Sequence, residues 1–345
     1  MRPPAVVYYQ SARPAGRILA RDHNLASPVS GKELAFTVDG ELVTLDGEER
    51  YAIEDGILRL FVEEADASSG EVTRTVQTFY EDAPFPNYSS YDSLESFLKR
   101  AIQGVFANLL AAQIPMNAKV LEVGCGTGQL SNYLAATTMA HFYATDMTLA
   151  SLRLGQEFAA KYDIPGITFL QMNLFAPCIR PGAMDIVISN GVLHHTADTE
   201  HAFKTIAPLV KPGGYLIVGL YNWVGRVRTD LRRGLYRLFG ESMLVLDPHL
   251  RQNLAPEKRQ AWINDQYRHP QERKHTLSEV LGWFKDAGFT FVSSIPKIGG
   301  QFTEGERLFV PRDPGSRFDR FAAELGMIFS HGGEGGLFIM IGRRD

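Results

Sequence analysis

A strand that runs directly into a glycine-rich loop constrains this chain more than any other feature. Residues 120–123 read Val-Leu-Glu-Val, and Gly124, Gly126 and Gly128 follow at alternate positions. Glycine permits positive φ angles and lets a ligand lie against bare backbone. A helix is expected from about residue 128, so the segment predicts a strand, a binding loop and a helix of an open α/β sheet.

Strands and helices alternate after residue 118. The run Ile186-Val187-Ile188 is apolar at every position, which indicates a strand buried on both faces. An α/β fold with a largely parallel sheet covered by helices is therefore expected. The predicted strands are 119–123, 142–145, 168–171, 185–189, 215–220, 289–295 and 337–342, and the predicted helices between the first five are 128–136, 148–162 and 198–210.

Two common glycine-loop sites do not match this loop. A dinucleotide fingerprint requires a third glycine at position 129, where Gln129 stands, and the Gly-Lys-Ser/Thr of a Walker loop is absent. Glu122 precedes the first glycine by two positions, and its carboxylate would repel a phosphate. The same carboxylate suits a ligand that carries an ammonium group.

A second carboxylate follows the next predicted strand. Asp146 lies 22 residues after Gly124, a spacing at which an acidic side chain accepts hydrogen bonds from the hydroxyls of a ribose. A ligand with an adenosine, an ammonium group and no phosphate fits the pair Glu122 and Asp146. S-adenosylmethionine has these features.

From about residue 75 to residue 344 the chain resembles the class I, Rossmann-like S-adenosylmethionine-dependent methyltransferases. Five motifs carry the resemblance: the glycine loop, Asp146, Gln171-Met172-Asn173-Leu174, the run from Asp185 to His195, and Leu209-Val210-Lys211-Pro212-Gly213-Gly214. The resemblance implies a seven-stranded sheet whose last strand is antiparallel.

The resemblance also implies a cofactor site. The glycine loop would meet the methionine part of the cofactor, Asp146 the ribose, Asn173 the adenine amino group and Asn190 the inner wall. The family usually has Asp at the position of Asn173, which leaves adenine recognition by this side chain or by backbone groups open. The complete expected set of cofactor-binding residues is Glu122, Gly124, Cys125, Gly126, Gly128, Asp146, Met147, Asn173, Leu174, Asn190 and Gly191.

The catalytic candidates follow the fourth and fifth strands. His194 and His195 come after the fourth strand, where a histidine could act as a general base near neutral pH. The alternative is an architectural role, because similar Leu-His-His runs occur in family members with many substrates. Tyr221 is a third catalytic candidate, and Asn222 is a candidate acceptor contact.

Two further segments are candidates for a lid or a substrate site. Tyr80 and Tyr88 belong to an aromatic, proline-containing segment that resembles a stretch found ahead of some family members, where it closes over the cofactor; ordinary packing is the alternative. Arg226 begins an arginine-rich helix whose basic face suits an anionic substrate, an acidic membrane surface, RNA or plain solvent.

Three parts are expected along the chain. Residues 1–62 form a small β-rich module, because Asp-Gly pairs separate short β-prone runs. The module resembles the zinc-ribbon activators of tRNA and protein methyltransferases, with Ser27 and Ser30 at cysteine positions, so no metal is expected. Residues 63–117 form a linker and a helical lid with a helix at 93–113, and residues 118–345 form the main domain with a helical cap at 223–269.

Composition narrows the function. The formal net charge is −4, so nucleic acid stays an alternative that overall charge does not favour. Two cysteines and the lack of a long apolar run predict a cytoplasmic protein without a disulfide framework or transmembrane segment. The leading hypothesis is methyl transfer from S-adenosylmethionine to an oxygen or carbon of a small or medium-sized metabolite.

Two other hypotheses stay open at this point. They are a tRNA or protein methyltransferase, and a non-catalytic S-adenosylmethionine-binding subunit of a complex. Ser189-Asn190-Gly191-Val192 replaces the Asn/Asp-Pro-Pro-Tyr with which the family methylates exocyclic or amide nitrogens, which argues against methylation of adenine N6 or of glutamine. The sequence leaves the acceptor and the oligomeric state open.

Overall fold

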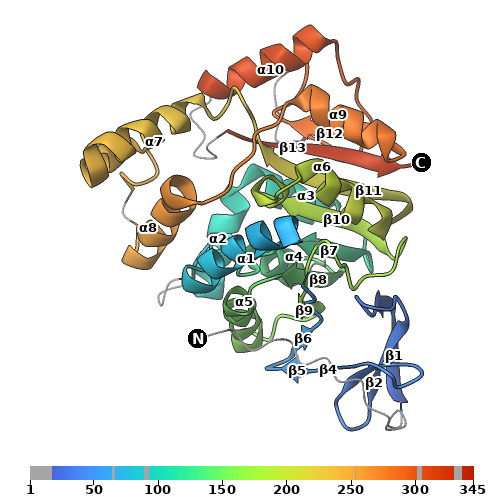
Figure 1. The fold of residues 1–345 in the computed structure, drawn as a ribbon. Coiled ribbons are helices and arrows are strands. Elements are labelled where there is room, and N and C mark those ends of the chain that lie inside the picture. The colour runs from blue at the N-terminus through green and yellow to red at the C-terminus, as the bar shows by residue number, and fades with distance from the viewer. Residues whose placement is uncertain (1–17, 64–66, 89–92, 253, 301–304, 330–335) are drawn as a thin grey trace.

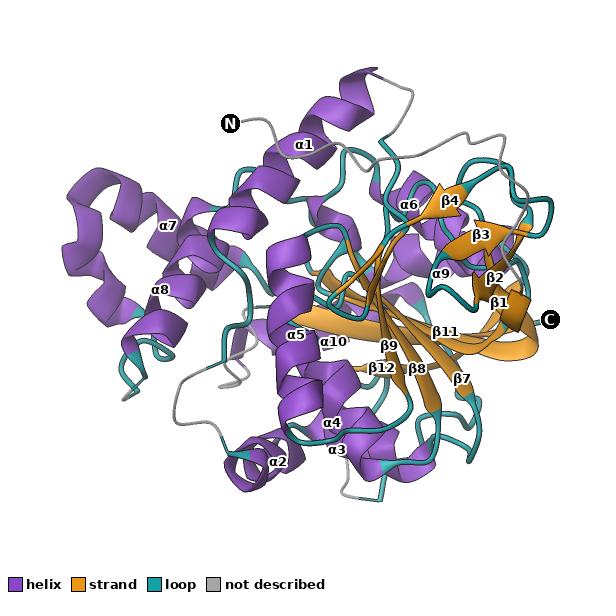
Figure 2. Ribbon diagram, turned by 90° about the horizontal axis from the view of Figure 1, so that it is seen from below, coloured by secondary structure: helices purple, strands orange, loops and turns teal. Residues whose placement is uncertain are grey.

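The structure is a computed structural model that describes residues 18–63, 67–88, 93–252, 254–300, 305–329 and 336–345. A large twisted sheet with helices on both faces forms its centre (Figures 1 and 2). A small antiparallel sheet lies at one end, and a group of helices from the segment after the fifth core strand lies at the other (Figure 1).

The central sheet has the order β12-β13-β11-β10-β7-β8-β9-β6-β5. Its seven core strands are β7 (Lys119–Val123), β8 (His141–Asp146), β9 (Ile167–Gln171), β10 (Met184–Asn190), β11 (Val210–Tyr221), β12 (Phe289–Ile295) and β13 (Leu337–Arg344). Strands β7 to β11 pair in parallel, whereas β13 is antiparallel to both of its neighbours. The predicted α/β fold with an antiparallel last strand is confirmed.

Apolar alternation along the strands fills two cores, one on each face of the sheet. In β10, Ile186 and Ile188 join one core while Val187 joins the other. The first core is closed by α3 (Val105–Gln113), α4 (Gln129–Thr137) and α5 (Leu149–Lys161), and the second by α6 (Thr199–Ile206) and α9 (Leu277–Asp286). Figure 2 shows the two groups of helices on opposite sides of the strands.

The helices that precede the main domain differ from the prediction. The single helix expected at 93–113 is two helices, α2 (Leu94–Gln103) and α3, because Gly104 between them is extended (φ −76°, ψ 106°). Helix α1 (Ala67–Asp82) was not predicted, and it includes residues 67–70 that had been assigned to a linker. Residues 67–70 are small or polar and carry no periodicity, but Val72, Val76, Phe79 and Tyr80 recur at helical spacing, which is the signal that could have identified this helix.

Helix α1 is attached to the main domain through a helix N-terminus. The Glu81 carboxylate accepts hydrogen bonds from the backbone N–H groups of Leu149 (2.7 Å) and Ala150 (3.1 Å). These N–H groups begin α5 and have no partner within the helix, so a carboxylate satisfies them and interacts favourably with the helix dipole. The contact holds α1 beside the loop that follows β8.

The N-terminal part is a four-stranded antiparallel sheet made of β1 (Ile18–Ala26), β2 (Glu33–Thr37), β3 (Leu42–Thr44) and β4 (Arg50–Tyr51). The next two strands, β5 (Ile53–Glu54) and β6 (Ile57–Arg59), belong to the central sheet instead, where β6 pairs in parallel with β9. The segment predicted as a separate module at 1–62 therefore contributes two strands to the main sheet; its residues 1–17 lie outside the described part.

A buried polar cluster occupies the turn that resembles a zinc ribbon. The Ser27 hydroxyl donates to Glu49 and lies 2.8 Å from the Tyr51 hydroxyl, and it accepts from the Ser30 N–H at 3.0 Å. Among the described residues, no group of three or more His, Cys, Asp or Glu side chains is arranged to hold a metal ion. Hydrogen bonds, rather than thiolates, fix this turn.

The small sheet shares its core with the main domain. Leu25 is fully buried in the core that also contains Leu170 and Ile179. The Ala26 N–H donates to the Cys178 carbonyl at 2.8 Å, and the Lys119 ammonium donates to the Asn24 side chain at 2.8 Å. Apolar burial and hydrogen bonds across this junction indicate that the sheet and the main domain unfold together.

The helical segment after β11 forms a subassembly with its own core. It contains α7 (Val227–Phe239), the 3₁₀ segment η3 (Gly240–Leu246), α8 (Pro256–Ile263) and a π-helical turn, η4 (Asn264–Arg268). Leu244, Leu250, Ile263 and Tyr267 pack together beneath them. The last helix of the chain is α10 (Arg317–Phe329). No helix in the described ranges is both long and apolar enough to span a bilayer.

Substitution of Leu25 by Ala should destabilise the whole protein, because the side chain is buried between the small sheet and the main domain. We expect the free energy of unfolding to fall by about 2–5 kcal/mol in urea denaturation, with a single transition. Leu19→Ala is the control on the same strand, since Leu19 is 70% exposed, and its effect should stay within about 0.5 kcal/mol. A separate early transition in Leu25→Ala, with the main transition unchanged, would show that the sheet folds independently.

Candidate functional site

A cavity of about 510 Å³ lies along the carboxyl ends of the parallel strands. Loops after β7, β8, β9 and β10 form one side of it, and helix α1 with the α8–η4 segment forms the other. Such an edge of an open parallel sheet is where ligands of this fold class bind. Predicted residues in its wall are Tyr80, Glu122, Gly124, Cys125, Gly126, Asp146, Met147, Asn173, Leu174, Asn190, Gly191, His195 and Tyr221.

The glycine loop presents bare backbone to the cavity. Gly124, Gly126 and Gly128 have φ angles of 72°, 54° and 70°. A Cβ atom on Gly126 would lie 2.2 Å from the Phe85 carbonyl oxygen, and one on Gly124 would lie 2.5 Å from the Val192 side chain. Both positions therefore require glycine. Gly128 precedes the first residue of α4 and does not line the cavity.

Asp146 connects the glycine loop to the loop after β8. One carboxylate oxygen accepts from the Gly126 N–H at 2.8 Å, and the other accepts from the Thr148 N–H and hydroxyl at 2.9 and 2.8 Å. A carboxylate offers about four acceptor positions, so one remains for a ligand hydroxyl. Burial raises the pKa of this carboxyl group, although these hydrogen bonds favour its charged form.

Glu122 lies deeper in the same wall. Its side chain is buried, and the Ser131 hydroxyl donates to it. Burial raises the pKa of Glu122 to about 7, against the opposing effect of the Ser131 hydrogen bonds. An ammonium group placed nearby would favour the ionised carboxylate and lower this pKa. Cys125, next in the wall, is also buried, which raises the pKa of its thiol and makes it a packing residue.

Asn190 and Gly191 end strand β10 at the cavity. The Asn190 side-chain oxygen is buried and has no hydrogen-bond partner among the described residues. This oxygen lies against Gly219 of β11, where an added Cβ atom would be 1.9 Å from it, so it faces the neighbouring strand rather than the cavity. Met147 and Leu174 add apolar surface to the wall after β8 and β9.

Asn173 is at the predicted place, but its polar atoms already have partners. Its side-chain N–H donates to the Val62 carbonyl, and its oxygen accepts from the Phe175 N–H, each at 3.0 Å. The side chain thereby joins the loop after β9 to the segment after β6. Recognition of an adenine amino group by Asn173 stays a prediction, with backbone groups of this loop as the alternative.

The two predicted lid tyrosines have different positions. Tyr80, on α1, lines the cavity and donates to the Asp265 carboxylate at 2.9 Å. Tyr88 lies outside the cavity wall, where it donates to the Thr127 carbonyl at 3.1 Å and stacks on Phe158 with 4.5 Å between ring centroids. Tyr88 therefore supports the glycine loop from behind.

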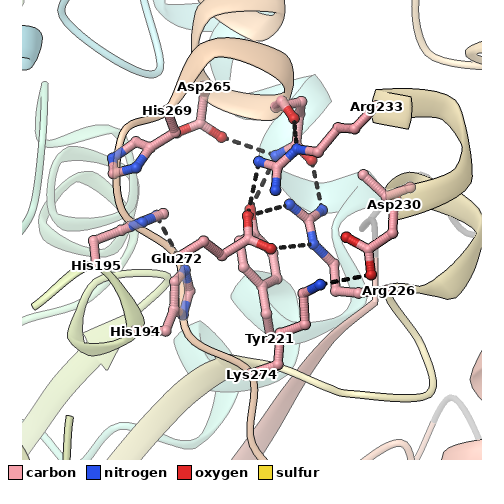
Figure 3. Close-up of polar contacts among 12 residues, drawn as sticks. His194, His195, Tyr221, Arg226, Asp230, Arg233, Asp265, His269, Glu272 and Lys274 are labelled. Atoms are coloured by element: carbon pink, nitrogen blue, oxygen red, sulfur yellow. Dashed lines mark hydrogen bonds and ion pairs between the residues drawn. The ribbon is translucent and has the colours of Figure 1, made fainter. Parts of the chain in front are cut away.

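The two histidines form a chain of hydrogen bonds (Figure 3). The His195 Nδ1 lies 2.7 Å from the Gln271 carbonyl, which only accepts, so this nitrogen carries the proton. The lone pair on His195 Nε2 then accepts from His194 Nε2 at 3.1 Å. Burial lowers the pKa of His195 to about 4, and that of His194 well below its ordinary value. His195 lines the cavity as a neutral ring, and its lone pair is already used.

Arg226 and Tyr221 lie at the centre of a buried polar network (Figure 3). The Arg226 guanidinium is 3.7 Å from the centroid of the Tyr221 ring and donates to Glu272 at 2.6 and 3.1 Å. Burial opposes ionisation of Glu272, but Arg226 and Arg233 outweigh it and lower its pKa to about 2. Arg226 is therefore a structural cation behind Tyr221, not part of the cavity wall.

Asn222 also lies outside the cavity. Its side-chain oxygen accepts from the N–H groups of Val224 and Gly225, each at 2.9 Å, and its amide donates to the His275 carbonyl at 3.2 Å. All of its hydrogen-bonding groups are used to hold the turn that leads into α7. The sequence could not separate this role from an acceptor contact.

Several wall residues were not predicted. Trp262, Asp265 and Gln266 come from the cap and close the end of the cavity that Tyr221 lines. Gln266 donates to Asp265 at 2.8 Å and to the Tyr221 hydroxyl at 2.9 Å. Burial raises the pKa of Asp265. In the sequence, these two residues are only an acidic residue next to an amide within the expected cap. The π-helical turn Asn264–Arg268, which directs both side chains into the cavity, has no recognisable sequence pattern.

Comparison with known proteins agrees with this geometry. Residues 121–218, which run from β7 to β11, match a family model described as a methyltransferase domain. Over 131 residues the chain is 34% identical to an uncharacterised methyltransferase of Mycobacterium tuberculosis, covering 38% of this chain and 62% of that protein. Over 105 residues it is 30% identical to the ubiquinone biosynthesis O-methyltransferase of Albidiferax ferrireducens, covering 30% of this chain and 41% of that protein.

The chain thus spans about half of the length of these curated relatives, between 41% and 62%. Among solved structures, PKMT2 from Rickettsia typhi aligns with a TM-score of 0.51 at 13% identity, covering 76% of this chain and 55% of that one. This structural likeness shows a shared fold.

The cavity fits S-adenosylmethionine. Bare backbone at Gly124 and Gly126 and the two carboxylates in the wall match a ligand that has an ammonium group, a ribose diol and no phosphate. Glu122 would hold the ammonium end and Asp146 a ribose hydroxyl, while Asn190 is a wall residue. S-adenosylmethionine is the cofactor of this domain.

Substitution of Asp146 by Ala should weaken S-adenosylmethionine binding about tenfold or more, because a charge-assisted hydrogen bond is worth about 1.5–3 kcal/mol. Titration calorimetry measures the affinity, and Asp39→Ala, an exposed change in the small sheet, is the control. Undiminished affinity in Asp146→Ala would contradict the ribose assignment.

The pH dependence of stability should change in Glu122→Gln. The native protein holds the Glu122 proton up to about pH 7, whereas the unfolded chain releases it near 4.5, so this group lowers the free energy of unfolding as pH rises through that window. Relative to Glu122→Gln, the wild-type protein should lose about 2–3 kcal/mol between pH 4.5 and 7. Urea denaturation without cofactor measures both proteins, and parallel curves would contradict the assignment.

Proposed function

We propose that this chain, a class I S-adenosylmethionine-dependent methyltransferase, transfers a methyl group to an oxygen or carbon atom of a small or medium-sized metabolite. The observation that supports this most is the single cavity that runs from the glycine loop to Tyr221 and the cap residues Asp265 and Gln266. Its volume is within the range of small-molecule sites, about 300–1,000 Å³.

The cofactor, when bound, supplies a methyl group on a positively charged sulfur that is already a good leaving group. The protein must therefore align the acceptor and, where the acceptor is neutral, take up its proton. The glycine loop, Glu122 and Asp146 would fix the cofactor end. The acceptor would lie at the other end, between α1 and the cap.

Two side chains at the cap end are suited to an acceptor hydroxyl. Burial raises the pKa of Tyr221 to about 12, so its hydroxyl stays protonated and can donate. The Asp265 carboxylate is held by Tyr80 and Gln266, and its raised pKa makes it a better proton acceptor than an ordinary aspartate. We assign proton uptake to Asp265. His195 would form a neutral part of the cavity wall, and His194 would support it from behind.

A polymer acceptor is less well supported. Of the arginines of the cap, Arg226 and Arg233 pair with Glu272, and Arg232 pairs with Asp247. Cations that are paired in this way leave fewer charges for phosphate contacts than the sequence indicated. The ubiquinone-pathway relative is named as an O-methyltransferase, which agrees with an oxygen acceptor.

The activity test is release of S-adenosylhomocysteine with a panel of metabolites that contain phenolic, carboxylic or enolic oxygens. Methylated products are identified by mass spectrometry. Turnover with an oxygen or carbon acceptor supports the proposal. Turnover with tRNA or protein alone, or S-adenosylmethionine binding without turnover on any acceptor, would overturn it.

Substitution of Asp265 by Asn should lower kcat about 10²- to 10⁴-fold, the usual contribution of a general base. Cofactor affinity should change little, and the rise of kcat with pH should disappear. Asp247→Asn is the matched control: Asp247 is a buried carboxylate of the same cap that accepts from Trp262 and Tyr267 but does not line the cavity. Equal losses in both variants would assign the effect to cap stability.

A further inference from the structure

Helix α7 carries an apolar stripe on its outer side. Val227, Leu231 and Leu238 recur at intervals of four and seven residues, which places them on one helical face. Their exposed fractions are 50%, 65% and 76%. The opposite face of α7 packs against the rest of the protein: Thr229 is buried there, and Arg233 donates a hydrogen bond to η4. The stripe therefore has no partner in the described part of the chain.

Helix α10 carries a second stripe. Phe318, Phe321, Leu325 and Phe329 follow intervals of three and four residues and are 77%, 48%, 38% and 69% exposed. On the inner face Glu324 accepts from the Leu277 N–H, which fixes how the helix is turned. Exposed apolar residues on an ordinary protein surface are usually scattered singly, whereas three phenylalanines are grouped on the outward face of this helix.

Helix α10 contacts the turn that leads into α7. Met327 of α10 packs on Gly225, just before α7, so closely that a Cβ atom on Gly225 would lie 3.1 Å from the Met327 side chain. Figure 1 shows both helices on the same edge of the molecule, away from the small N-terminal sheet. The two stripes thus lie on helices that adjoin through this turn.

The charges beside these stripes are positive and not neutralised. Arg228 and Arg237 on α7 and Arg317 on α10 are exposed, with no side-chain ion pair or hydrogen bond to another described residue. The acidic residues of the two helices are engaged: Asp230 binds Lys274, and Asp319 binds Ser316. Apolar stripes flanked by free arginines are typical of helices that lie in the surface of an anionic bilayer.

We propose that α7 and α10 form a docking surface for an anionic membrane. In a symmetric dimer through this region the same arginines would face each other without acidic partners, whereas anionic headgroups complement every one of them. RNA could use the arginines and stack bases on the phenylalanines, but it has no use for the exposed aliphatic stripe of Val227, Leu231 and Leu238, which a bilayer would cover. The cap that closes the cavity would then also be the part that contacts lipid.

Vesicle flotation with the full-length protein tests the proposal. Binding is expected to vesicles of phosphatidylcholine with phosphatidylglycerol, to be much weaker with phosphatidylcholine alone, and to decrease with salt. Phe318→Ser with Phe329→Ser, and separately Arg228→Gln with Arg237→Gln, should each weaken binding about tenfold or more. The control is Leu19→Ser with Val38→Ser, two exposed apolar residues of the small sheet, which should leave binding unchanged.

Cofactor affinity measures whether each variant is folded, and it should not change because none of these residues lines the cavity. Loss of lipid binding with normal cofactor affinity supports the proposal, whatever the acceptor is. Binding that is insensitive to both pairs of substitutions overturns it. If the protein does not bind vesicles, two other results would also overturn the proposal. One is a stable dimer that dissociates in the phenylalanine variants, and the other is salt-sensitive binding to RNA.

Discussion

The site depends on one carboxylate that joins two loops. Asp146 accepts from Gly126 on the loop after β7 and from Thr148 on the loop after β8. The Gly126 N–H can point to this carboxylate because its backbone adopts a positive φ with the Phe85 carbonyl packed against its α-carbon. The glycine loop, the aromatic segment before the domain and the end of β8 thus fix one another, and the cavity is shaped before any ligand enters.

A second constraint connects the cap to the sheet. Glu272 and the guanidinium groups of Arg226 and Arg233 are charges removed from water, and the carboxylate forms ion pairs with both guanidinium groups. Because Arg226 also lies on the Tyr221 ring at the end of β11, the network holds the cap against that strand. Loss of Glu272 would leave the two guanidinium groups without this carboxylate, so Glu272 is the member on which the attachment of the cap to the strand most depends.

The sequence was most informative where interactions are local. Strand burial, the glycine loop and the spacing to Asp146 follow from short patterns, and the sheet agrees with them. The break at Gly104 and the placement of Tyr88 behind the glycine loop depend on packing between distant segments, so periodicity could not predict them. Asp265 reaches the cavity only because the cap contains a π-helical turn. The His195 tautomer is set by a hydrogen bond to Gln271, a residue 76 positions away, so the sequence could not show that the lone pair of His195 is already used.

The side chain of Asn173 connects the cavity wall to the N-terminal segment. It is in the cavity wall, and it also donates to the Val62 carbonyl, where the chain leaves the two strands that the N-terminal segment adds to the sheet. A free energy that couples ligand binding to the attachment of that segment must act equally in both directions. A favourable contact between a ligand and the Asn173 side chain would therefore also stabilise the attachment of β5 and β6 to the central sheet, and detachment of these two strands would weaken ligand binding.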